Sequence, residues 1–503
     1  MTDAFHMLID GKLVDGPTTF DVVNPATGQA FAKCPKADSA LLNKAVAAAK
    51  AAFPAWSKRP IDERAGMVQK ISEALEARME EFARLLSTEQ GKPLDQARYE
   101  MFGAIFTLRA FAAMRPETKV LKDEGGNKVF EHRTPLGVVA SITPWNFPVI
   151  LLCNKLGPAL VTGNTMVAKP APTTPLTTLK FAEMANKILP PGVLNVICDQ
   201  NDLGGELSSH PDIAKVAFTG STATGKKVMA SAADGLKRVT LELGGNDAAI
   251  VMDDVDPKVV AKKVYEGAMV NAGQVCVAIK RAYVPEGMYD EFCDELASLA
   301  KAAVVDDAFQ QGAEIGPVQN KMQYEKLKGM LAEAREQGTV LAGGDAIDRP
   351  GYFIAPTIVK DLPESARLVQ EEQFGPVLPV LKYNDIEDVI ARANNSNYGL
   401  AGTVWGQDLA KATDVAMRID SGTVWVNQHM AIDANIPFRG SKESGMGAEL
   451  GQAGLNEYTQ AHIVNAVPLA CSLQRPCRHA RLEKPCDKAA PPFLVIERLK
   501  NKQ

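Results

Sequence analysis

The sequence has few of the features that mark secreted, membrane or nucleic-acid-binding proteins. Its 503 residues include only 8 cysteines, and these form no pattern of pairs, which favours reduced thiols over a disulfide framework. No apolar run approaches the length of a membrane span, and the N-terminal segment lacks the basic and apolar regions of a secretory signal. The net charge of −5 disfavours a surface that follows phosphates. We therefore expect a cytoplasmic protein with no nucleic-acid partner and no membrane partner.

The chain does contain an alternation of apolar strands and helices. Between residues 137 and 245, short β-branched segments such as "GVVASIT" and "KVAFTG" alternate with amphipathic helical segments. This order is typical of βαβ units with a buried parallel sheet, in which ligands bind at the carboxyl ends of the strands. A second α/β alternation runs from about residue 251 to residue 430. The length suits two large domains.

Two regions of the chain offer little chemistry. The first 115 residues contain short strand signals and then helical periodicity over 38–56 and 62–90. The last residues, 468–503, are rich in Pro, Arg and Lys and predict a mostly flexible basic tail. Their Cys471, Cys477, Cys486 and His479 do not have the intervals of zinc ligands, so no metal is expected.

Four positions in the two alternating regions could take part in chemistry. "FTGSTATG" places Ser221 between a strand and a helix, where free N–H groups can bind a phosphate, although such turns are also common N-caps. Lys169 follows a strand and could reach a ribose hydroxyl, or could be a solvated lysine. Glu242 lies in an apolar strand, which is costly unless the carboxylate has a partner or a task. Cys276 follows Gly-Gln and is either a nucleophile or a small buried side chain.

Six motifs in order resemble those of the aldehyde dehydrogenase superfamily, from about residue 8 to about residue 466. They are "PWNFP", "FTGSTATG", "LELGGND", "NAGQVC", "EEQFGPV" and "PFRGSKESGMG". The resemblance implies an α/β fold with a Rossmann-like parallel-sheet NAD(P)-binding domain, a second α/β catalytic domain and a small β oligomerisation flap. The implied ranges are 1–115 and 137–250 for the first, 251–430 for the second, and 116–136 with 454–467 for the flap. It also implies self-association as a homodimer or homotetramer.

The resemblance implies oxidation of an aldehyde through a covalent intermediate. Cys276 would be the nucleophile that forms a thiohemiacetal and then a thioester. Asn146 would stabilise the oxyanion together with the Cys276 N–H, and Glu242 would be the general base for hydrolysis. Lys155 and Glu449 match positions that relay protons.

The same resemblance implies NAD or NADP as cofactor and no metal. The matching cofactor-binding positions are Trp145, Lys169, Pro172, Gly220, Ser221, Gly225, Glu372 and Phe374. Pro172 departs from a frequent NAD-preferring pattern, in which an acid three residues after the lysine binds both ribose hydroxyls. Without that carboxylate a 2′-phosphate would not be repelled, so the choice is open, with a slight preference for NAD.

The partner molecule implied is a small-molecule aldehyde. The positions that match the substrate entrance are Phe147, Leu151, Asn154, Val275 and Val277. Their apolar character favours an uncharged aliphatic or aromatic aldehyde. Asn154 stands where succinate-semialdehyde dehydrogenases have an Arg, which disfavours that substrate. Arg439 replaces a Gly that is usual in the family.

Other functions are also open. A semialdehyde dehydrogenase, succinate-semialdehyde-like or CoA-acylating, would share the nucleophile, but acylating enzymes generally lack the glutamate at Glu242. A cysteine hydrolase would need a His near Cys276, and none of the 6 histidines lies near these motifs in the sequence. A catalytically silent protein of the same fold would have no reason to keep Cys276, Glu242 and Asn146 together.

Overall fold

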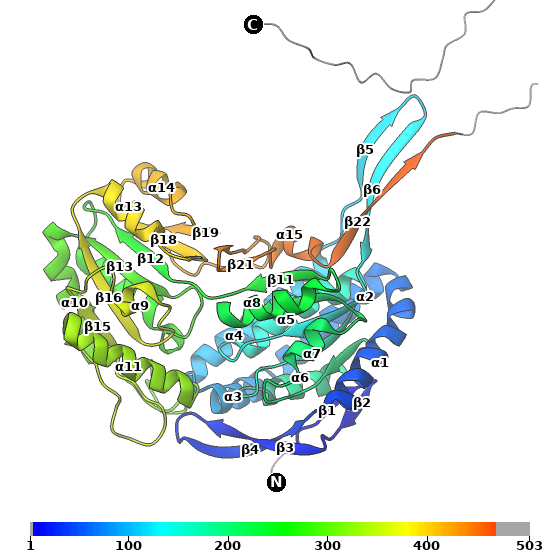
Figure 1. Cartoon of the computed structure of the whole chain (residues 1–503), viewed down its shortest axis with the longest axis horizontal. Coiled ribbons are helices and arrows are strands. Elements are labelled where there is room, and N and C mark those ends of the chain that lie inside the picture. The colour runs from blue at the N-terminus through cyan, green and yellow to red at the C-terminus, as the bar shows by residue number, and fades with distance from the viewer. Residues whose placement is uncertain (1–3, 469–503) are drawn as a thin grey trace, which may run out of the picture.

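The computed structural model of the protein describes residues 4–468. The tail predicted over 468–503 lies, from residue 469 on, outside the described residues, and so do Cys471, Cys477, Cys486 and His479. Figure 1 shows two sheet-containing units side by side and a three-stranded arm that projects from them. Within residues 4–468, no helix is both long enough and apolar enough to cross a membrane.

The N-terminal region forms two hairpins and four helices. Its elements are β1 (Met7–Ile9), β2 (Lys12–Val14), β3 (Thr18–Asn24), β4 (Gln29–Lys36), α1 (Ser39–Lys58), α2 (Ile61–Ala77), α3 (Met79–Gln90) and α4 (Leu94–Ala113). The helical periodicity over 62–90 thus corresponds to two helices. Arg78, with φ −117° and ψ 16°, leaves the helical region and ends α2 where α3 begins.

The first unit is built on an eight-stranded sheet in the order β2-β1-β9-β8-β7-β10-β11-β21. The further strands are β7 (Val138–Ile142), β8 (Thr165–Lys169), β9 (Leu194–Val196), β10 (Ile213–Thr219), β11 (Arg238–Glu242) and β21 (Gly445–Met446). The helices α5 (Pro148–Thr162), α6 (Leu176–Ala185), α7 (Gly204–Ser209) and α8 (Thr222–Ala233) pack against these strands together with α1. The strands β9-β8-β7-β10-β11 are parallel, which confirms the Rossmann-like sheet. The strand order reverses between β7 and β10, where such sheets bind ligands.

The second unit contains a seven-stranded sheet in the order β14-β15-β16-β13-β12-β18-β19. Its strands are β12 (Asp247–Val251), β13 (Ile279–Pro285), β14 (Thr339–Ala342), β15 (Thr357–Lys360), β16 (Val377–Tyr383), β18 (Ala401–Trp405) and β19 (Thr423–Val426). Its helices are α9 (Pro257–Met269), α10 (Tyr289–Ala302), α11 (Lys321–Gln337), α12 (Arg367–Gln370), α13 (Ile386–Asn394) and α14 (Leu409–Met417). The boundary expected between the two units, after residue 250, falls inside β12 and needs correction. The range 137–250 assigned almost all of this strand to the first unit, whereas it belongs to the second sheet. Its apolar residues are buried between β13 and β18 of the second sheet.

The arm is an antiparallel sheet in the order β22-β6-β5. It consists of β5 (Lys119–Glu124), β6 (Asn127–Pro135) and β22 (Thr459–Ala466), and α15 (Gly451–Asn456) leads into β22. The short strands β17 (Tyr398–Gly399) and β20 (Ser441–Lys442) pair separately. The arm lies in the two segments expected to form a flap, and its role in assembly stays a prediction.

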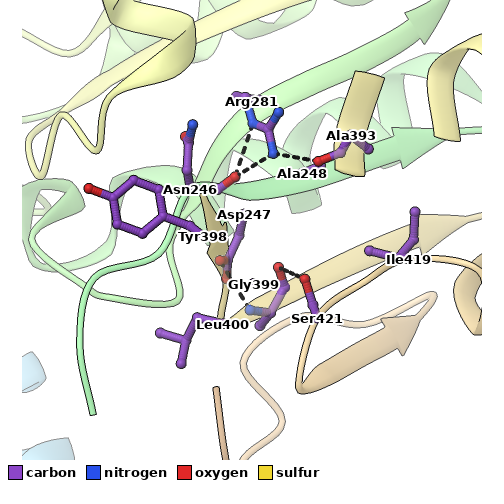
Figure 2. Close-up of a pocket in the computed structure, with 11 residues that line it drawn as sticks. Asn246, Asp247, Ala248, Arg281, Ala393, Tyr398, Gly399, Leu400, Ile419 and Ser421 are labelled. Carbon is purple, nitrogen blue, oxygen red and sulfur yellow. Dashed lines mark hydrogen bonds between the residues drawn. The ribbon is translucent and has the colours of Figure 1, made fainter. Parts of the chain in front are cut away.

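The connection between the two large sheets is short and buried. Only residues 243–246 separate the end of β11 from the start of β12, so the carboxyl edge of the first sheet faces the amino edge of the second. Figure 2 shows how the linker is fixed: Arg281 donates to the Asn246 carbonyl oxygen from Nε at 3.0 Å and from Nη2 at 2.7 Å. Asp247 Oδ1 accepts the Ala401 N–H at 3.2 Å.

Asp247 should make the stability of the fold depend on pH. Burial is the main cause that raises the pKa of its carboxyl to about 7, whereas the unfolded chain has the ordinary value near 3.8. The protonated Asp247 carboxyl therefore contributes its full share to the free energy of unfolding below the pKa of the unfolded chain. This contribution is lost as the pH rises through about 7. Asp247→Asn imitates the protonated form, so we expect it to reduce this loss and to be more stable than the wild type at pH 8, by on the order of 1 kcal/mol.

The measurement is urea unfolding at several pH values between 4 and 8. The exposed Asp294 offers a matched control, because Asp294→Asn should leave the pH dependence unchanged. A variant Asp247→Asn with the wild-type pH dependence would contradict the assignment of this carboxyl.

Candidate functional site

A cavity of about 730 Å³ lies where the two sheets face each other. Residues that follow β7, β8 and β10 form one wall, as expected at the switch point of a parallel sheet. The opposite wall comes from the second unit and includes residues that precede β13 and β16. The predicted site residues brought together along this cavity are Trp145, Asn146, Lys169, Gly220, Ser221, Cys276, Glu372 and Phe374.

Two predicted cofactor positions do not line this cavity. Gly225 lies on the buried side of α8, where a Cβ atom would overlap with the Leu243 side chain. Its lack of a side chain therefore lets α8 pack closely on the linker after β11. Pro172 is also absent from the cavity wall, although the adjacent Ala171 is part of it.

The N-terminus of α8 opens onto the cavity. Ser221 is the N-cap, and its hydroxyl accepts the Thr224 N–H at 3.3 Å. A Cβ atom on Gly220 would lie 2.5 Å from the Phe218 ring, so a glycine is required here. The free N–H groups and the helix dipole at this end favour an anion, which fits the pyrophosphate of a dinucleotide.

Lys169 has an acidic partner that the sequence analysis missed. Its Nζ lies 2.6 Å from Asp199 Oδ1, and the other oxygen of Asp199 accepts the Leu203 N–H at 2.9 Å. Asp199 follows β9 in the segment "LNVICD", and an acid directly after an apolar strand was the available signal. A carboxylate therefore does lie beside the lysine, although it does not come from the position of Pro172.

Glu372 lies at the boundary between the two units. Its Oε1 accepts the Gly245 N–H at 2.9 Å, and a Cβ atom on Gly244 would stand 2.5 Å from Oε2. The "GG" of the linker thus allows the close approach of this carboxylate. Phe374 meets Trp145 edge to face, with ring centroids 5.3 Å apart, so aromatic side chains from both units meet across the cavity.

A left-handed turn presents Cys276. The helix α9 stops at Met269, and a 3₁₀ segment, Val270–Gly273, follows it. Within it, Asn271, Ala272 and Gly273 have φ values of 53°, 54° and 69°. Such values are common for glycine but unusual for Asn271 and Ala272, which carry side chains. A Cβ atom on Gly273 would overlap with the Gly375 carbonyl oxygen. Close packing against the segment before β16 in the same unit therefore fixes the turn that precedes the cysteine.

Cys276 and Asn146 meet at one end of the cavity. Asn146 is buried, and its side-chain amide donates one hydrogen bond to the Gln274 carbonyl oxygen at 3.0 Å. Cys276 is partly exposed, and desolvation raises the pKa of its thiol to about 12. The positive charge of Lys280 opposes this rise, and nearby carboxyls add to it. The resting group is therefore a thiol that needs a base or a favourable charge to become a nucleophile.

Glu242 lies close to a buried ion pair. Lys155 Nζ is 2.5 Å from Glu449 Oε1 and 2.6 Å from Thr219 Oγ1. Burial raises the pKa of the Glu242 carboxyl well above its usual range, the negative charge of Glu449 raises it further, and Lys155 lowers it. Asn154 donates to Glu449 Oε2 at 3.3 Å, so this predicted entrance residue contacts the ion pair. Lys155, Glu449, Asn154 and Thr219 thus form one hydrogen-bonded group, and the charges of Lys155 and Glu449 act on Glu242.

An apolar cluster surrounds Cys276. It contains Phe147, Val275, Val277, Trp425, Met430 and Phe438. Leu151, the other apolar entrance position, is partly buried and lies one turn of α5 beyond Phe147. The cysteine therefore stands between a dinucleotide-sized cavity and an apolar surface.

A second buried ion pair positions Asn146 and was not expected from the sequence. Lys92 Nζ lies 2.6 Å from Glu100 Oε2 and donates to the Asn146 carbonyl oxygen at 2.8 Å. Glu100 Oε1 accepts the Val149 N–H at 2.9 Å, at the start of α5. The available signal was an acid on the apolar face of α4, next to Met101. The first 115 residues therefore do contribute to the site.

The structure places a histidine closer to Cys276 than the sequence indicates. The His429 ring lies 2.7 Å from the Val277 carbonyl oxygen through Nε2 and packs edge to face on Trp425. Burial lowers its pKa to about 4, which keeps the ring neutral. Among residues 4–468 it makes no hydrogen bond to Cys276, so the arrangement of a cysteine hydrolase is not formed. In the same part of the chain, no three His, Cys, Asp or Glu side chains are grouped as for a metal ion.

Comparisons with known proteins agree with this geometry. The model of the aldehyde dehydrogenase family matches residues 13–464. Retinaldehyde dehydrogenase 3 of Homo sapiens is 39% identical over 455 residues, which are 88% of this chain and 89% of that protein. The NAD⁺ complex of a Bacillus cereus aldehyde dehydrogenase has a TM-score of 0.90 at 36% identity and covers 92% of this chain and 97% of its own. An NADP-dependent E. coli enzyme has a TM-score of 0.90 at 35% identity, with 92% and 98% covered. The chain belongs to the aldehyde dehydrogenase family and is an NAD(P)-dependent enzyme that acts on aldehydes.

Proposed function

We propose that the protein oxidises an uncharged aliphatic or aromatic aldehyde to the carboxylic acid through a thioester on Cys276. The observation that supports this most directly is the position of Cys276. It stands where a dinucleotide-sized cavity meets an apolar cluster, beside the amide of Asn146. An aldehyde carbon at Sγ would then lie between the cofactor cavity and the apolar surface.

The first step is attack of the Cys276 sulfur on the aldehyde carbon, with loss of the thiol proton. The developing oxyanion needs donors that are already in place. Asn146 has a second amide N–H besides the one bonded to Gln274. The Cys276 N–H donates to no protein group within the part of the chain that the structure describes. These two donors form the proposed oxyanion site.

NAD or NADP, when bound, supplies the hydride acceptor. The residues proposed to position it are Lys169 at the adenine-side ribose, Ser221 at the pyrophosphate and Glu372 at the nicotinamide ribose. We propose NAD as the preferred form, because Asp199 neutralises Lys169 at 2.6 Å. A neutralised lysine attracts a 2′-phosphate less strongly than a free one.

Hydrolysis of the thioester needs a water that has lost a proton. Glu242 is proposed to accept this proton, because a carboxyl with a raised pKa is a stronger base than an ordinary one. Glu449 and Lys155 are proposed to pass the proton on, since they form a continuous buried contact near Glu242. This use of Glu242 favours release to water over transfer to CoA.

The three-stranded arm has exposed apolar residues that bear on how the chain assembles. Val120, Leu121 and Ile463 of the three-stranded sheet are between 46% and 57% exposed, and apolar patches of this kind suit subunit contacts. We therefore propose that the arm joins subunits in a homodimer or homotetramer.

The cysteines among residues 4–468 are all free thiols, which suits the cytoplasmic location that the sequence predicts.

Replacement of the proposed nucleophile should separate chemistry from cofactor binding. We expect Cys276→Ser to abolish aldehyde oxidation, because a serine hydroxyl is a weaker nucleophile. NAD(P) should still bind, since its proposed contacts are made by other side chains. Turnover by absorbance of the reduced cofactor and binding by calorimetry check both points. Turnover retained in this variant would sink the assignment.

Replacement of the proposed base should stop the reaction after the redox step. We expect Glu242→Gln to form about one equivalent of reduced cofactor per site in a burst and then to stall, because the thioester is not hydrolysed. In the wild type, hydrolysis needs the ionised Glu242 carboxylate. Because the pKa of this group is raised, kcat should already fall at pH values above those at which ordinary carboxyls become protonated. Rapid-mixing kinetics over pH 5–9 measure both. Normal steady-state turnover of Glu242→Gln would place the base elsewhere.

The apolar cluster predicts which aldehydes are oxidised. We expect activity without CoA on aliphatic, benzaldehyde-type and phenylacetaldehyde-type substrates, and poor activity on succinate semialdehyde, because no arginine stands at Asn154. The kcat/KM values of such a panel, each with NAD and with NADP, test the substrate class and the cofactor together. A clear preference for succinate semialdehyde, or a strict need for CoA, would support the semialdehyde alternatives instead.

A further inference from the structure

Lys280 is a buried lysine at the nucleophile that no motif singled out. It lies at the start of β13, four residues after Cys276, and only 1% of its surface is exposed. Its Nζ donates to the Val275 and Cys276 carbonyl oxygens at 2.8 Å each and to the Ala278 carbonyl oxygen at 3.2 Å. The buried ammonium therefore binds three carbonyl oxygens of the turn 275–278 and holds them together.

The chemistry of this contact is unusual for a purely structural group. An ammonium has three N–H donors, and here all three go to carbonyls of the turn that contains the cysteine. A carboxylate, Glu372 Oε1, lies further away at 3.9 Å. A buried charge is costly unless it is hydrogen-bonded and compensated, and a neutral amide could have donated to two of the same carbonyls without that cost. The full positive charge therefore calls for an explanation.

We propose that Lys280 is a positioning residue for the nucleophile, which fixes the turn 275–278 and supplies the positive charge that faces the Cys276 sulfur when it ionises. This inference rests on the proposed role of Cys276. It adds to that role the group in the chain that favours thiolate formation beside several carboxyls.

The charges around Cys276 show why such a group is needed. The carboxyls that act on its thiol come from three elements: Glu372 before β16, Glu242 at the end of β11, and Asp247 at the start of β12. Each of them raises the pKa of the thiol, and so does burial. Lys280 acts in the opposite direction, and it also lowers the pKa of Glu372 and of Asp247. One ammonium thus offsets the negative charges of both units at the place where the thiolate has to form.

The test measures the reactivity of the thiol without turnover. The rate of Cys276 alkylation by iodoacetamide is followed between pH 6.5 and pH 9.5 by peptide mass spectrometry. Over this range, below the pKa of the thiol, the rate reports the thiolate fraction. We expect Lys280→Gln to lower the rate about tenfold or more at each pH, because loss of a neighbouring opposite charge raises the pKa of a thiol by about one unit or more. Lys280→Arg keeps the charge and should restore most of the rate.

Two controls separate charge from structure. Lys215 is another fully buried lysine, bonded to Thr240 Oγ1 at 2.6 Å on the first sheet, and Lys215→Gln should leave the alkylation rate of Cys276 unchanged. Thermal unfolding identifies variants that do not fold. If Lys280→Gln is one of these, Glu372→Gln gives a second measurement with Lys280 in place: removal of the carboxylate should speed alkylation.

A tenfold loss in Lys280→Gln that Lys280→Arg reverses supports the proposal, and so does faster alkylation of Glu372→Gln. Wild-type rates in Lys280→Gln, equal losses in the Gln and Arg variants, or an unchanged rate in Glu372→Gln would overturn it. The assignment of Cys276 as the nucleophile fails separately, through retained oxidation in Cys276→Ser.

Discussion

The four residues that join β11 to β12 impose the main constraint on the site. Because residues 243–246 are so few, the chain leaves one parallel sheet at its carboxyl edge and enters the next at its amino edge. The two edges therefore face each other across the cavity. The first sheet contributes residues that follow strands, such as Asn146 and Ser221. The second contributes residues that precede strands, such as Cys276 and Glu372.

Buried lysines stabilise this arrangement at several points. Each of the segments that supply the reacting groups is tied by an ammonium to a carboxylate: Lys92 to Glu100, Lys155 to Glu449, Lys169 to Asp199 and Lys280 to Glu372. Buried ion pairs contribute little net stability, because desolvation offsets the attraction. Their value here lies in geometry, since loss of either partner would leave an uncompensated charge. Burial is the main cause of the raised pKa values of Glu242 and Cys276, and two of these pairs act on them as well: Lys155 with Glu449 on Glu242, and Lys280 with Glu372 on Cys276.

Much of the fold could be predicted from the sequence. Apolar strands that alternate with helices indicated parallel sheets, and inspection of the strand ends led to Lys169, Ser221 and Glu242. That rule describes only the carboxyl edge of a sheet. Cys276 and Glu372 lie at an amino edge. The Gly-Gln pair before Cys276 left two readings of that cysteine open, and Glu372 was identified through the family resemblance alone.

The remaining features depend on tertiary contacts that no local pattern records. Lys92, Lys280 and Asp199 have sequence neighbours that resemble ordinary surface or strand-end positions, and their oppositely charged partners lie 8 to 92 residues away. The placement of β12 could not be read from its apolar sequence, because a strand buried on both faces suits either sheet. The break at Arg78 was hidden for a similar reason, since apolar residues recur at helical spacing on both sides of it.

The central claim is that an acyl group resides on Cys276 during turnover. The most direct measurement is acid quenching of the working enzyme with an isotopically labelled aldehyde, followed by peptide mapping. The account predicts a labelled acyl adduct on the peptide that contains Cys276, which disappears when the substrate is exhausted. A labelled adduct on another residue, or full turnover with an unmodified Cys276 peptide at every time point, would contradict it.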